Sequence, residues 1–183
     1  MKMNKKNIGA ALALYPSPVV VIGAMENGKA TWTLAAHAGT MAHSHLMVSL
    51  NQTHYINKGI KEARKLSVNV VDASWLREAD KSGTISGNKE DKSQMFNYTL
   101  SEEGVPMIDV SKVSIVCDVV DDYELDRFDN FICRIVSTYC DEDILNEKDR
   151  IDYHVFKPVL FEFPTYEYFV TGEKAGDCAR MNK

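Results

Sequence analysis

Apolar and polar residues follow one another in short stretches at the start of the chain, in a pattern typical of antiparallel β-strands. Val19 to Met25 is an apolar, β-branched run, and the Asn27-Gly28 pair that follows favours a tight hairpin turn. The returning segment covers residues 30–40, and another strand pattern covers residues 46–50. The first part of the chain is therefore predicted to form antiparallel β-structure.

The pattern changes to a helical period after residue 53. Ile56, Ile60 and Ala63 recur at helical spacing between residues 54 and 65, and charged residues occupy the opposite face. Residues 66–71 then alternate with a period of two, as a half-buried strand does. We expect one amphipathic helix followed by a strand.

Residues 72–104 are polar and hold few β-formers, which predicts an excursion over the surface. Short helices are expected within it at residues 75–80 and 92–96. At the start of the chain, the apolar residues 8–14 predict a short first helix that leads into the first buried strand. These three helices are predicted in addition to the amphipathic one.

The last part of the chain returns to strand patterns. Residues 113–123 and 131–139 are long β-rich runs, which predict a second hairpin with an acidic tip at residues 124–130. Residues 158–163 predict the last strand, which Pro164 ends. At least six strand candidates and few helices predict a mainly β fold: a closed or nearly closed antiparallel barrel with helices on its outside.

Composition narrows the class of protein. The 183 residues are 45% hydrophobic and 26% charged, which fits one folded domain over residues 1–183. The net charge of −5 argues against a nucleic-acid partner, and no apolar run approaches the roughly 20 residues that would cross a membrane. The four cysteines show neither a C-x-x-C pair nor zinc spacing, so we expect reduced thiols in a cytoplasmic protein.

Small and hydroxylated residues form the first candidate site. The common dinucleotide, NTPase, zinc-protease and hydrolase motifs are absent from the sequence. Residues 31–40, however, include Thr31, Thr33 and His37 where a strand normally carries bulky side chains. Such a strand lets a flat ligand lie against its backbone, although a close-packed strand crossing explains the same residues.

Two polar turns form the other candidates. Ser49, Asn51 and Thr53 lie where a strand ends and the amphipathic helix begins, so a phosphate there gains from backbone N–H groups and the helix dipole. Capping by Asn51 or Thr53 is the alternative. In the second turn Ser86 begins a polar loop and Lys92 offers a charge for a phosphate, although a solvated charged turn explains the same residues.

Histidine and cysteine do not complete a further site. His37, His43 and His45 suggest a metal, but no cysteine or carboxylate spacing supplies the remaining ligands, so no metal site is predicted. Cys117 and Cys133 are expected to face each other across the second hairpin as buried, unreactive thiols. No catalytic side chain is predicted.

In their order and spacing, these segments resemble the flavin reductase-like, FMN-binding split-barrel family, and especially its flavoredoxin branch. The likeness covers most of the chain from Leu12 to Cys178. The segments that carry it are Pro16–Gly23, Asn27–Lys29, Trp32–Thr40, Leu46–Leu50, His54–Glu62, Leu66–Val71, the S-G-x-x-x-D-K motif at Ser86–Lys92, Pro158–Glu162 and Thr171–Glu173.

The resemblance implies a six-stranded Greek-key split barrel that forms a homodimer, with FMN at the subunit interface. It also implies electron transfer from NADH or NADPH to the flavin, and onward to free flavin, ferric complexes or another acceptor. Since the flavin carries the chemistry, no protein nucleophile or base is needed.

The family pattern also assigns roles to residues of this sequence. It places Thr31 and His37 beside the cofactor, the phosphate near residues 49–57, and positive charge at Lys92. The aromatic residues Tyr166, Tyr168 and Phe169 are expected to close over the ring system. The cofactor-binding residues so predicted are Thr31, Thr33, His37, Ser49, Asn51, Thr53, Asn57, Ser86, Lys92 and Tyr168.

Three departures from the family pattern keep other functions open. Branch members often have Asn at the position of Thr31, Thr at that of Ile56 and Trp at that of His37. One lost hydrogen bond to a charged group is worth roughly 1.5–3 kcal/mol, which predicts weak or exchangeable FMN. The alternatives are a non-catalytic flavin- or haem-degradation-like binding module on the same barrel, and a cofactor-less dimer that binds a partner.

Overall fold

The computed structural model describes residues 4–181 and is built mainly from β-strands. The strands are β1 (Ser17–Pro18), β2 (Val20–Glu26), β3 (Lys29–Ala35), β4 (Ala38–Ala42), β5 (His45–Asn51), β6 (Lys65–Val70), β7 (Tyr98–Leu100), β8 (Pro106–Ile108), β9 (Val113–Leu125), β10 (Phe128–Cys140), β11 (Val159–Glu162) and β12 (Glu167–Val170). The helices are α1 (Ile56–Ala63) and α2 (Leu76–Thr84), with one 3-10 turn, η1 (Glu142–Ile144). The predicted fold class, mainly β with flanking helices, is confirmed.

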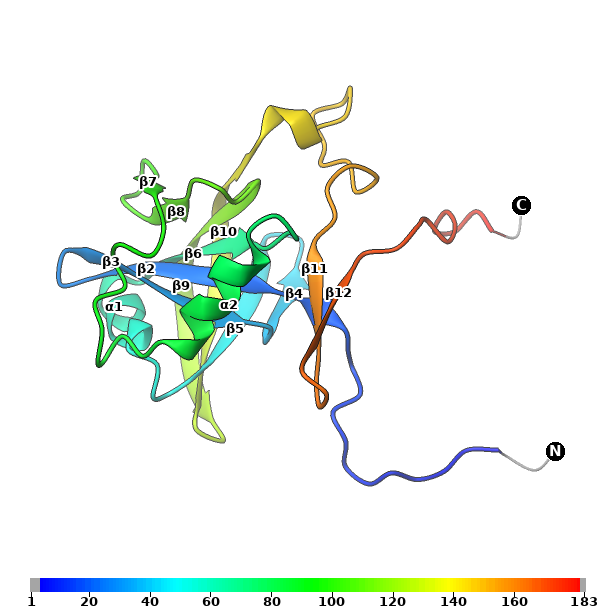
Figure 1. Cartoon of the computed structure of the whole chain (residues 1–183), viewed down its shortest axis with the longest axis horizontal. Helices are drawn as coiled ribbons and strands as arrows, with labels where there is room; N and C mark the ends of the chain where they lie inside the picture. Colours follow the sequence, from blue (N-terminus) through cyan, green and yellow to red (C-terminus); the bar gives the residue numbers. More distant parts are fainter. Residues whose placement is uncertain (1–3, 182–183) are drawn as a thin grey trace.

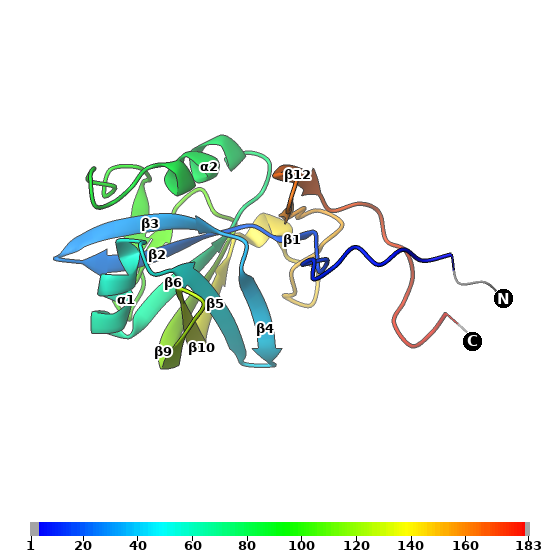
Figure 2. The ribbon, with the colours of Figure 1, turned by 90° about the horizontal axis from the view of Figure 1, so that it is seen from below.

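One large sheet forms the body of the molecule (Figures 1 and 2). Its seven strands run in the order β3-β2-β6-β9-β10-β5-β4, and each strand is antiparallel to its neighbours. The two edge strands β3 and β4 are successive along the chain, separated by Ala36 and His37. The expected returning segment 30–40 is therefore divided by a bend. A count of six strands and full closure of the barrel stay predictions.

Both long hairpins turn through two residues. Asn27 and Gly28 have φ of 50° and 74°, the left-handed backbone that a tight β-hairpin turn needs. Asp126 and Arg127 adopt similar values, 47° and 69°, between β9 and β10. The second hairpin was correctly expected, but its turn is shorter than the predicted tip because β9 and β10 pair up to Leu125 and Phe128.

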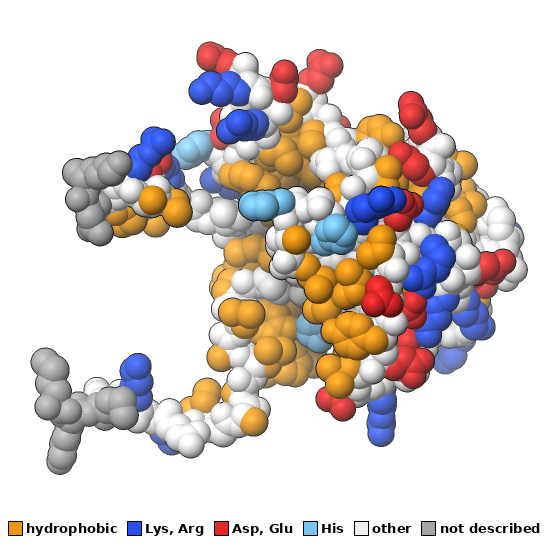
Figure 3. All heavy atoms as spheres, turned by 180° about the vertical axis from the view of Figure 1, so that it is seen from behind, with side chains coloured by type: hydrophobic (Ala, Val, Ile, Leu, Met, Phe, Trp, Pro, Cys, Tyr) orange, Lys and Arg blue, Asp and Glu red, His pale blue; other side chains and the backbone are white. Residues whose placement is uncertain are grey.

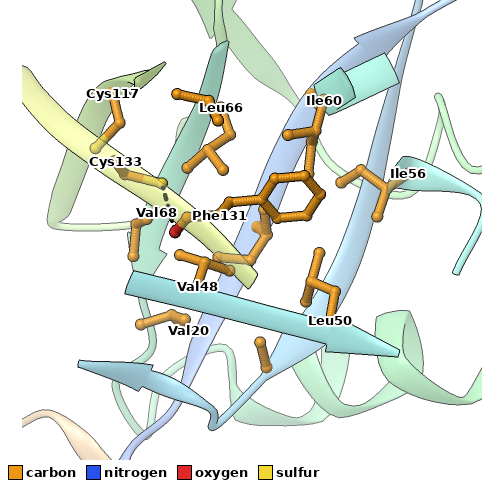
Figure 4. Close-up of a cluster of buried hydrophobic side chains, with 14 residues drawn as sticks. Val20, Val48, Leu50, Ile56, Ile60, Leu66, Val68, Cys117, Phe131 and Cys133 are labelled. Carbon is orange, nitrogen blue, oxygen red and sulfur yellow. Dashed lines mark hydrogen bonds between the residues drawn. The ribbon is translucent and has the colours of Figure 1, made fainter. Parts of the chain in front are cut away.

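Apolar side chains from the inner face of the sheet form one core, drawn in Figure 4. Phe131 lies at its centre and is fully buried, and Ile56 and Ile60 of α1 close one end of it. Burying one such side chain contributes about 1.5–3 kcal/mol. The apolar stripe predicted for this helix is thus the part that packs against the sheet.

A buried carboxylate fixes α1 to the β9–β10 hairpin. Asp129 accepts hydrogen bonds from Lys61 Nζ at 2.8 Å and from Asn57 Nδ2 at 2.7 Å. Only 3% of the Asp129 side chain is exposed. Arg64 extends the same contact by donating to the Asp122 carboxylate and to the Val119 carbonyl. The helix is therefore held by polar contacts as well as by its apolar face.

A second apolar core lies on the other face of β2 and β3, under α2. Trp32 is fully buried there, and its ring contacts the rings of Phe96 and Tyr98 edge-on at 5.6 and 5.7 Å. Figure 2 shows α2 lying over these strands, opposite the side of β4, β9 and β10. The polar excursion 72–104 therefore covers the sheet and supplies part of its packing.

Several local predictions were wrong. Residues 8–14 and 92–96 are not helical, and β7 forms inside the excursion, for which few β-formers and short helices were noted. A further strand, β12, follows Pro164 and pairs with β11. No helix within residues 4–181 is long and apolar enough to cross a membrane.

Candidate functional site

The edge strand β3 presents backbone groups on the side away from β2. The Trp32 carbonyl accepts a hydrogen bond from Lys92 at 2.8 Å on that side. Because backbone groups alternate in direction along an antiparallel strand, those of Leu34 face the same side as those of Trp32. The strand therefore offers main-chain donors and acceptors to the cavities beside it, as the sequence suggested.

Two cavities lie along β3 and together form a groove beside this strand. The smaller one is polar, has a volume of about 180 Å³ and lies at the Thr31 end of this groove. It is bounded by β3, by the turn that leads into α1, and by the end of α2. Its lining residues are Thr31–Thr33, Thr53–Ile56, Gly83–Gly87 and Lys92. A Cβ atom on Gly87 would meet the Tyr55 Cβ atom at 2.9 Å, so a glycine is needed for this close approach.

Lys92 is a buried cation at the wall of the polar cavity. The residue is 6% exposed, and its ammonium donates to the carbonyls of Trp32 at 2.8 Å and Ser82 at 2.7 Å. Burial lowers its pKa to about 8. It forms no ion pair with any residue of the described chain. An ammonium has three donors, so one remains for an anion that also supplies the missing counter-charge.

His54 joins the polar cavity to a larger one. Its Nδ1 lies 3.1 Å from Thr33 Oγ1, and burial, together with the charge of Lys92, lowers the pKa of its ring. The imidazole is therefore neutral at neutral pH and has one donor and one acceptor nitrogen. Sequence reasoning did not select His54, although it lies inside the turn that was assigned to the phosphate.

The larger, aromatic cavity has a volume of about 540 Å³ and lies at the Ala35 end of β3. The His37 ring lies 5.5 Å from the Phe128 ring, and His37 Nε2 lies 3.0 Å from the Tyr15 hydroxyl. The lining residues are Leu12, Tyr15, Val19, Leu34–His37, Ser49–Asn51, His54, Phe128, Phe161, Phe163 and Tyr166. Its volume lies within the roughly 300–1,000 Å³ of small-molecule sites, and its rings suit a flat ligand.

Eight of the ten predicted binding residues line one of the two cavities. Thr31, Thr33, Thr53, Ser86 and Lys92 line the polar cavity, and His37, Ser49 and Asn51 line the aromatic cavity. Asn57 and Tyr168 line neither. The Asn57 amide donates to Asp129 and to the Asn51 carbonyl, and the Tyr168 hydroxyl donates to Asp80 at 2.7 Å.

Aromatic residues from both ends of the chain line the aromatic cavity, and of these only Tyr166 was expected from the sequence. Tyr15 precedes β1, and its ring lies 6.2 Å from that of Phe161 on β11. Tyr166 lines the aromatic cavity as the family pattern implied, whereas Phe169 does not. The pairing of β1 with β11 brings these segments together, and the only local signal was the density of aromatic residues after Pro158.

Among the described residues, the site has neither a grouped set of metal ligands nor a reactive thiol. In residues 4–181 no three His, Cys, Asp or Glu side chains are grouped to hold a metal ion. Burial raises the pKa of both the Cys117 and the Cys133 thiol, so both stay protonated and weakly nucleophilic. The arrangement is that of a binding groove with one buried cation.

Comparison with known proteins gives consistent matches. Residues 12–168 match the family described as "Flavin reductase like domain". Flavoredoxin from Methanosarcina acetivorans is similar with a TM-score of 0.92 and 30% identity, over 98% of this chain and 97% of that one. Flavoredoxin of Desulfovibrio vulgaris (Miyazaki F) gives a TM-score of 0.90 and 25% identity, over 98% and 100% of the two chains.

Two further matches are a solved structure with the same fold and a relative found by sequence. An FMN-binding protein from Thermus thermophilus, with bound 1-cyclohex-2-enone, gives a TM-score of 0.81 at 20% identity, over 96% of this chain and 99% of that one. A protein of Archaeoglobus fulgidus is 29% identical over 111 residues, which span 59% of this chain and 63% of that relative. The family match over residues 12–168 includes β3.

Proposed function

This chain belongs to the flavin reductase-like, FMN-binding family, in its flavoredoxin branch, and on that premise we propose that it is an oxidoreductase that works through FMN. The observation that supports this most directly is Lys92, a buried ammonium without an acidic partner in residues 4–181. Such a charge beside hydroxyl side chains suits a phosphate group.

The residues along the groove fit the two ends of a flavin mononucleotide. Lys92, Thr31 and Ser86 would hold the phosphate in the polar cavity. His37, Phe128 and the backbone of Leu34 would hold the ring system in the aromatic cavity. Ile56 lines the polar cavity but packs its side chain into the core, so the hydroxyls there come from Thr31, Thr33, Thr53, Thr84 and Ser86.

The flavin, when bound, supplies the electron-transfer chemistry itself. The protein's own part is to position the ring and to exclude water from one face of it. Neutral His54 and the N–H groups of β3 are available as hydrogen-bond donors beside the ring and its side chain. We propose NADH or NADPH as the electron donor, and free flavin, ferric complexes or another small acceptor as the oxidant.

A second copy of the chain would complete the aromatic cavity. Met47, Ile132, Tyr123 and Leu125 lie on the outer face of β5, β9 and β10, opposite the inward side of Phe131. Tyr123 is 48% and Leu125 59% exposed. Figure 3 shows hydrophobic side chains gathered on this side of the molecule. Phe128 belongs to the same face and also lines the aromatic cavity, so we propose that a homodimer forms here.

The visible spectrum of the purified protein, before and after FMN addition and desalting, tests the proposal. A retained flavin spectrum, and consumption of NADH or NADPH that depends on it, are expected. Bound FMN without such consumption would favour a non-catalytic binding module. A colourless protein whose melting temperature does not change with FMN would favour a cofactor-less dimer and contradict our proposal.

Oligomeric state tests the second copy separately. Light scattering during gel filtration should give twice the mass of the 20.6 kDa chain. Leu125→Glu should shift the protein to monomer and weaken FMN binding, because it places a charge in the proposed interface. Glu102→Gln, an exposed change away from that face, serves as the control. A wild-type monomer with full FMN affinity would exclude the dimer.

A further inference from the structure

Four aromatic side chains at one end of the aromatic cavity contact one another in a closed ring. Tyr15 precedes β1, Phe161 lies on β11, and Phe163 and Tyr166 lie in the turn between β11 and β12. The ring centroid of Tyr15 is 6.2 Å from that of Phe161 and 6.4 Å from that of Phe163. The centroid of Tyr166 is 5.9 Å from the first of these and 5.2 Å from the second. All four residues line the aromatic cavity, and we call them the aromatic box.

The small sheet β1-β11-β12 brings these rings together. Ser17 lies opposite Phe161 in the antiparallel pairing of β1 with β11. Because side chains alternate between the two faces of a strand, Tyr15 and Phe163, each two positions further along, lie on the same face as Phe161. Tyr166 contacts two of these rings from the turn. The rings therefore come from elements other than β3, whose residues are proposed to hold the flavin.

The rings are spaced and tilted like the four sides of a box. Three of the four neighbouring pairs have interplanar angles of 87°, 69° and 70°, and the fourth has an angle of 44°. A cation about 4–5 Å from each of four perpendicular faces leaves neighbouring centroids roughly 6–7 Å apart, close to the spacing found here. The face of an aromatic ring carries the negative part of its quadrupole, so it attracts cations.

The charges near the aromatic box favour a cation over an anion. Among the described residues, those that line the aromatic cavity include no lysine, arginine or carboxylate. Glu162 and Glu167 lie opposite each other where β11 and β12 meet the turn, and neither forms an ion pair within residues 4–181. Because they alternate with the ring residues along the strands, they lie on the reverse face. Their charge therefore adds a negative potential without filling the box.

We propose that the aromatic box binds the methylated ammonium group of a small organic cation. A primary ammonium would lose hydrogen bonds to water that aromatic rings cannot replace. A quaternary ammonium has no N–H donors to leave unsatisfied, and its methyl groups spread the charge over the ring faces. This inference goes beyond the proposed function and does not depend on it, because the box is formed by side chains of this chain alone.

NMR titration of the purified protein with choline tests the proposal. The matched ligand is the neutral carbon analogue of choline, in which a tert-butyl group replaces the trimethylammonium group. Choline is expected to bind at least about tenfold more tightly than this analogue. Its methyl proton signals should shift upfield, because ring faces shield protons that lie over them. Equal affinities for the two molecules, or binding of neither, would overturn the proposal.

Two matched variants test where choline binds. Phe163→Leu removes one ring and should weaken choline binding about three- to tenfold, while the affinity for the neutral analogue changes less than about twofold. Phe169→Leu is the control, because Phe169 is 45% exposed, similar to 41% for Phe163, but lies outside the aromatic cavity. It should alter neither affinity. Equal effects of the two variants on choline would overturn the assignment to the box.

Two further measurements on the same samples complete the test. Thermal unfolding establishes that both variants are folded. FMN titration separates this inference from the proposed function, since loss of choline binding with intact FMN binding refutes the box alone. Choline binding with no FMN binding would support the box and contradict the flavin function.

Discussion

Two lysines with buried polar partners show how differently one residue type serves in this molecule. Lys61 on α1 is 41% exposed and reaches Asp129, whose side chain is 3% exposed. Lys92 is 6% exposed and meets only the carbonyls of Trp32 and Ser82. Lys61 and Asp129 neutralise each other, and their ion pair stabilises the fold. The charge of Lys92 has no acidic partner among the described residues, so an anionic ligand would neutralise it.

The largest effect on stability is expected from breaking the ion pair between Lys61 and Asp129. Lys61→Met should lower the free energy of unfolding by about 3 kcal/mol, because it leaves the buried Asp129 carboxylate without a counter-charge. Denaturation in urea measures this. Arg134→Met, which breaks a surface pair with Asp118 whose arginine is 57% exposed, is the control and should cost less than about 1 kcal/mol. Equal losses of unfolding free energy in the two variants would show that the burial of Asp129 adds nothing to the strength of its ion pair.

The charge of Lys92 should matter more for FMN binding than for the stability of the fold. Lys92→Met is expected to weaken FMN binding about 10- to 100-fold through the loss of one charged hydrogen bond. Its unfolding free energy should change by less than about 1 kcal/mol, because losing two carbonyl contacts is offset by no longer burying a charge. Isothermal titration and urea denaturation measure the two effects, with Lys81→Met as control. A large stability loss with unchanged FMN affinity would assign Lys92 to the fold alone.

The two lysines should also respond to pH with opposite signs. Burial lowers the pKa of Lys92 from 10.5 to about 8, so between these values the unfolded chain binds more protons than the folded one. Stability of the flavin-free protein should therefore rise by about 1 kcal/mol from pH 8 to pH 9 relative to Lys92→Met.

Lys61 gives the opposite response. Its hydrogen bond to Asp129 raises its pKa, so its stabilising contribution is lost only as the pH rises above 10.5.

FMN affinity should fall above pH 8 as Lys92 loses its proton. Urea denaturation at pH 7, 8 and 9 measures the rise in stability expected from Lys92, and FMN titration at the same pH values measures the fall in affinity. An FMN affinity that stays constant over this range would contradict a charged role for Lys92.

The smallest effect concerns the hydrogen bond that fastens the β11–β12 hairpin to α2. Tyr168→Phe removes the hydroxyl that donates to Asp80 and should cost about 0.5–1 kcal/mol of stability. Because Phe161 and Tyr166 of this hairpin region wall the aromatic cavity, FMN should also dissociate faster. Stopped-flow release of FMN measures this, with Tyr153→Phe as the exposed control. An unchanged release rate would mean that the wall stays in place without the bond.

Local patterns in the sequence were sufficient for much of the fold. The Asn27-Gly28 turn, the amphipathic helix with Ile56 and Ile60, and the alternating strand at 66–71 all formed where they were expected. Each depends on backbone preference or on burial of one face, which nearby residues determine. The family likeness likewise followed from the order of such segments, and eight of the ten residues that it indicated line one of the two cavities.

The tertiary structure alone decided which distant residues contact one another. Asn57 meets Asp129, 72 positions away, so the residue expected at the phosphate instead holds α1 to the hairpin. Lys92 meets Trp32, 60 positions away, and is left without an acidic neighbour among the described residues. Periodicity records whether a side chain is buried, but not which distant group it meets. That choice depends on how the strands are ordered in the sheet.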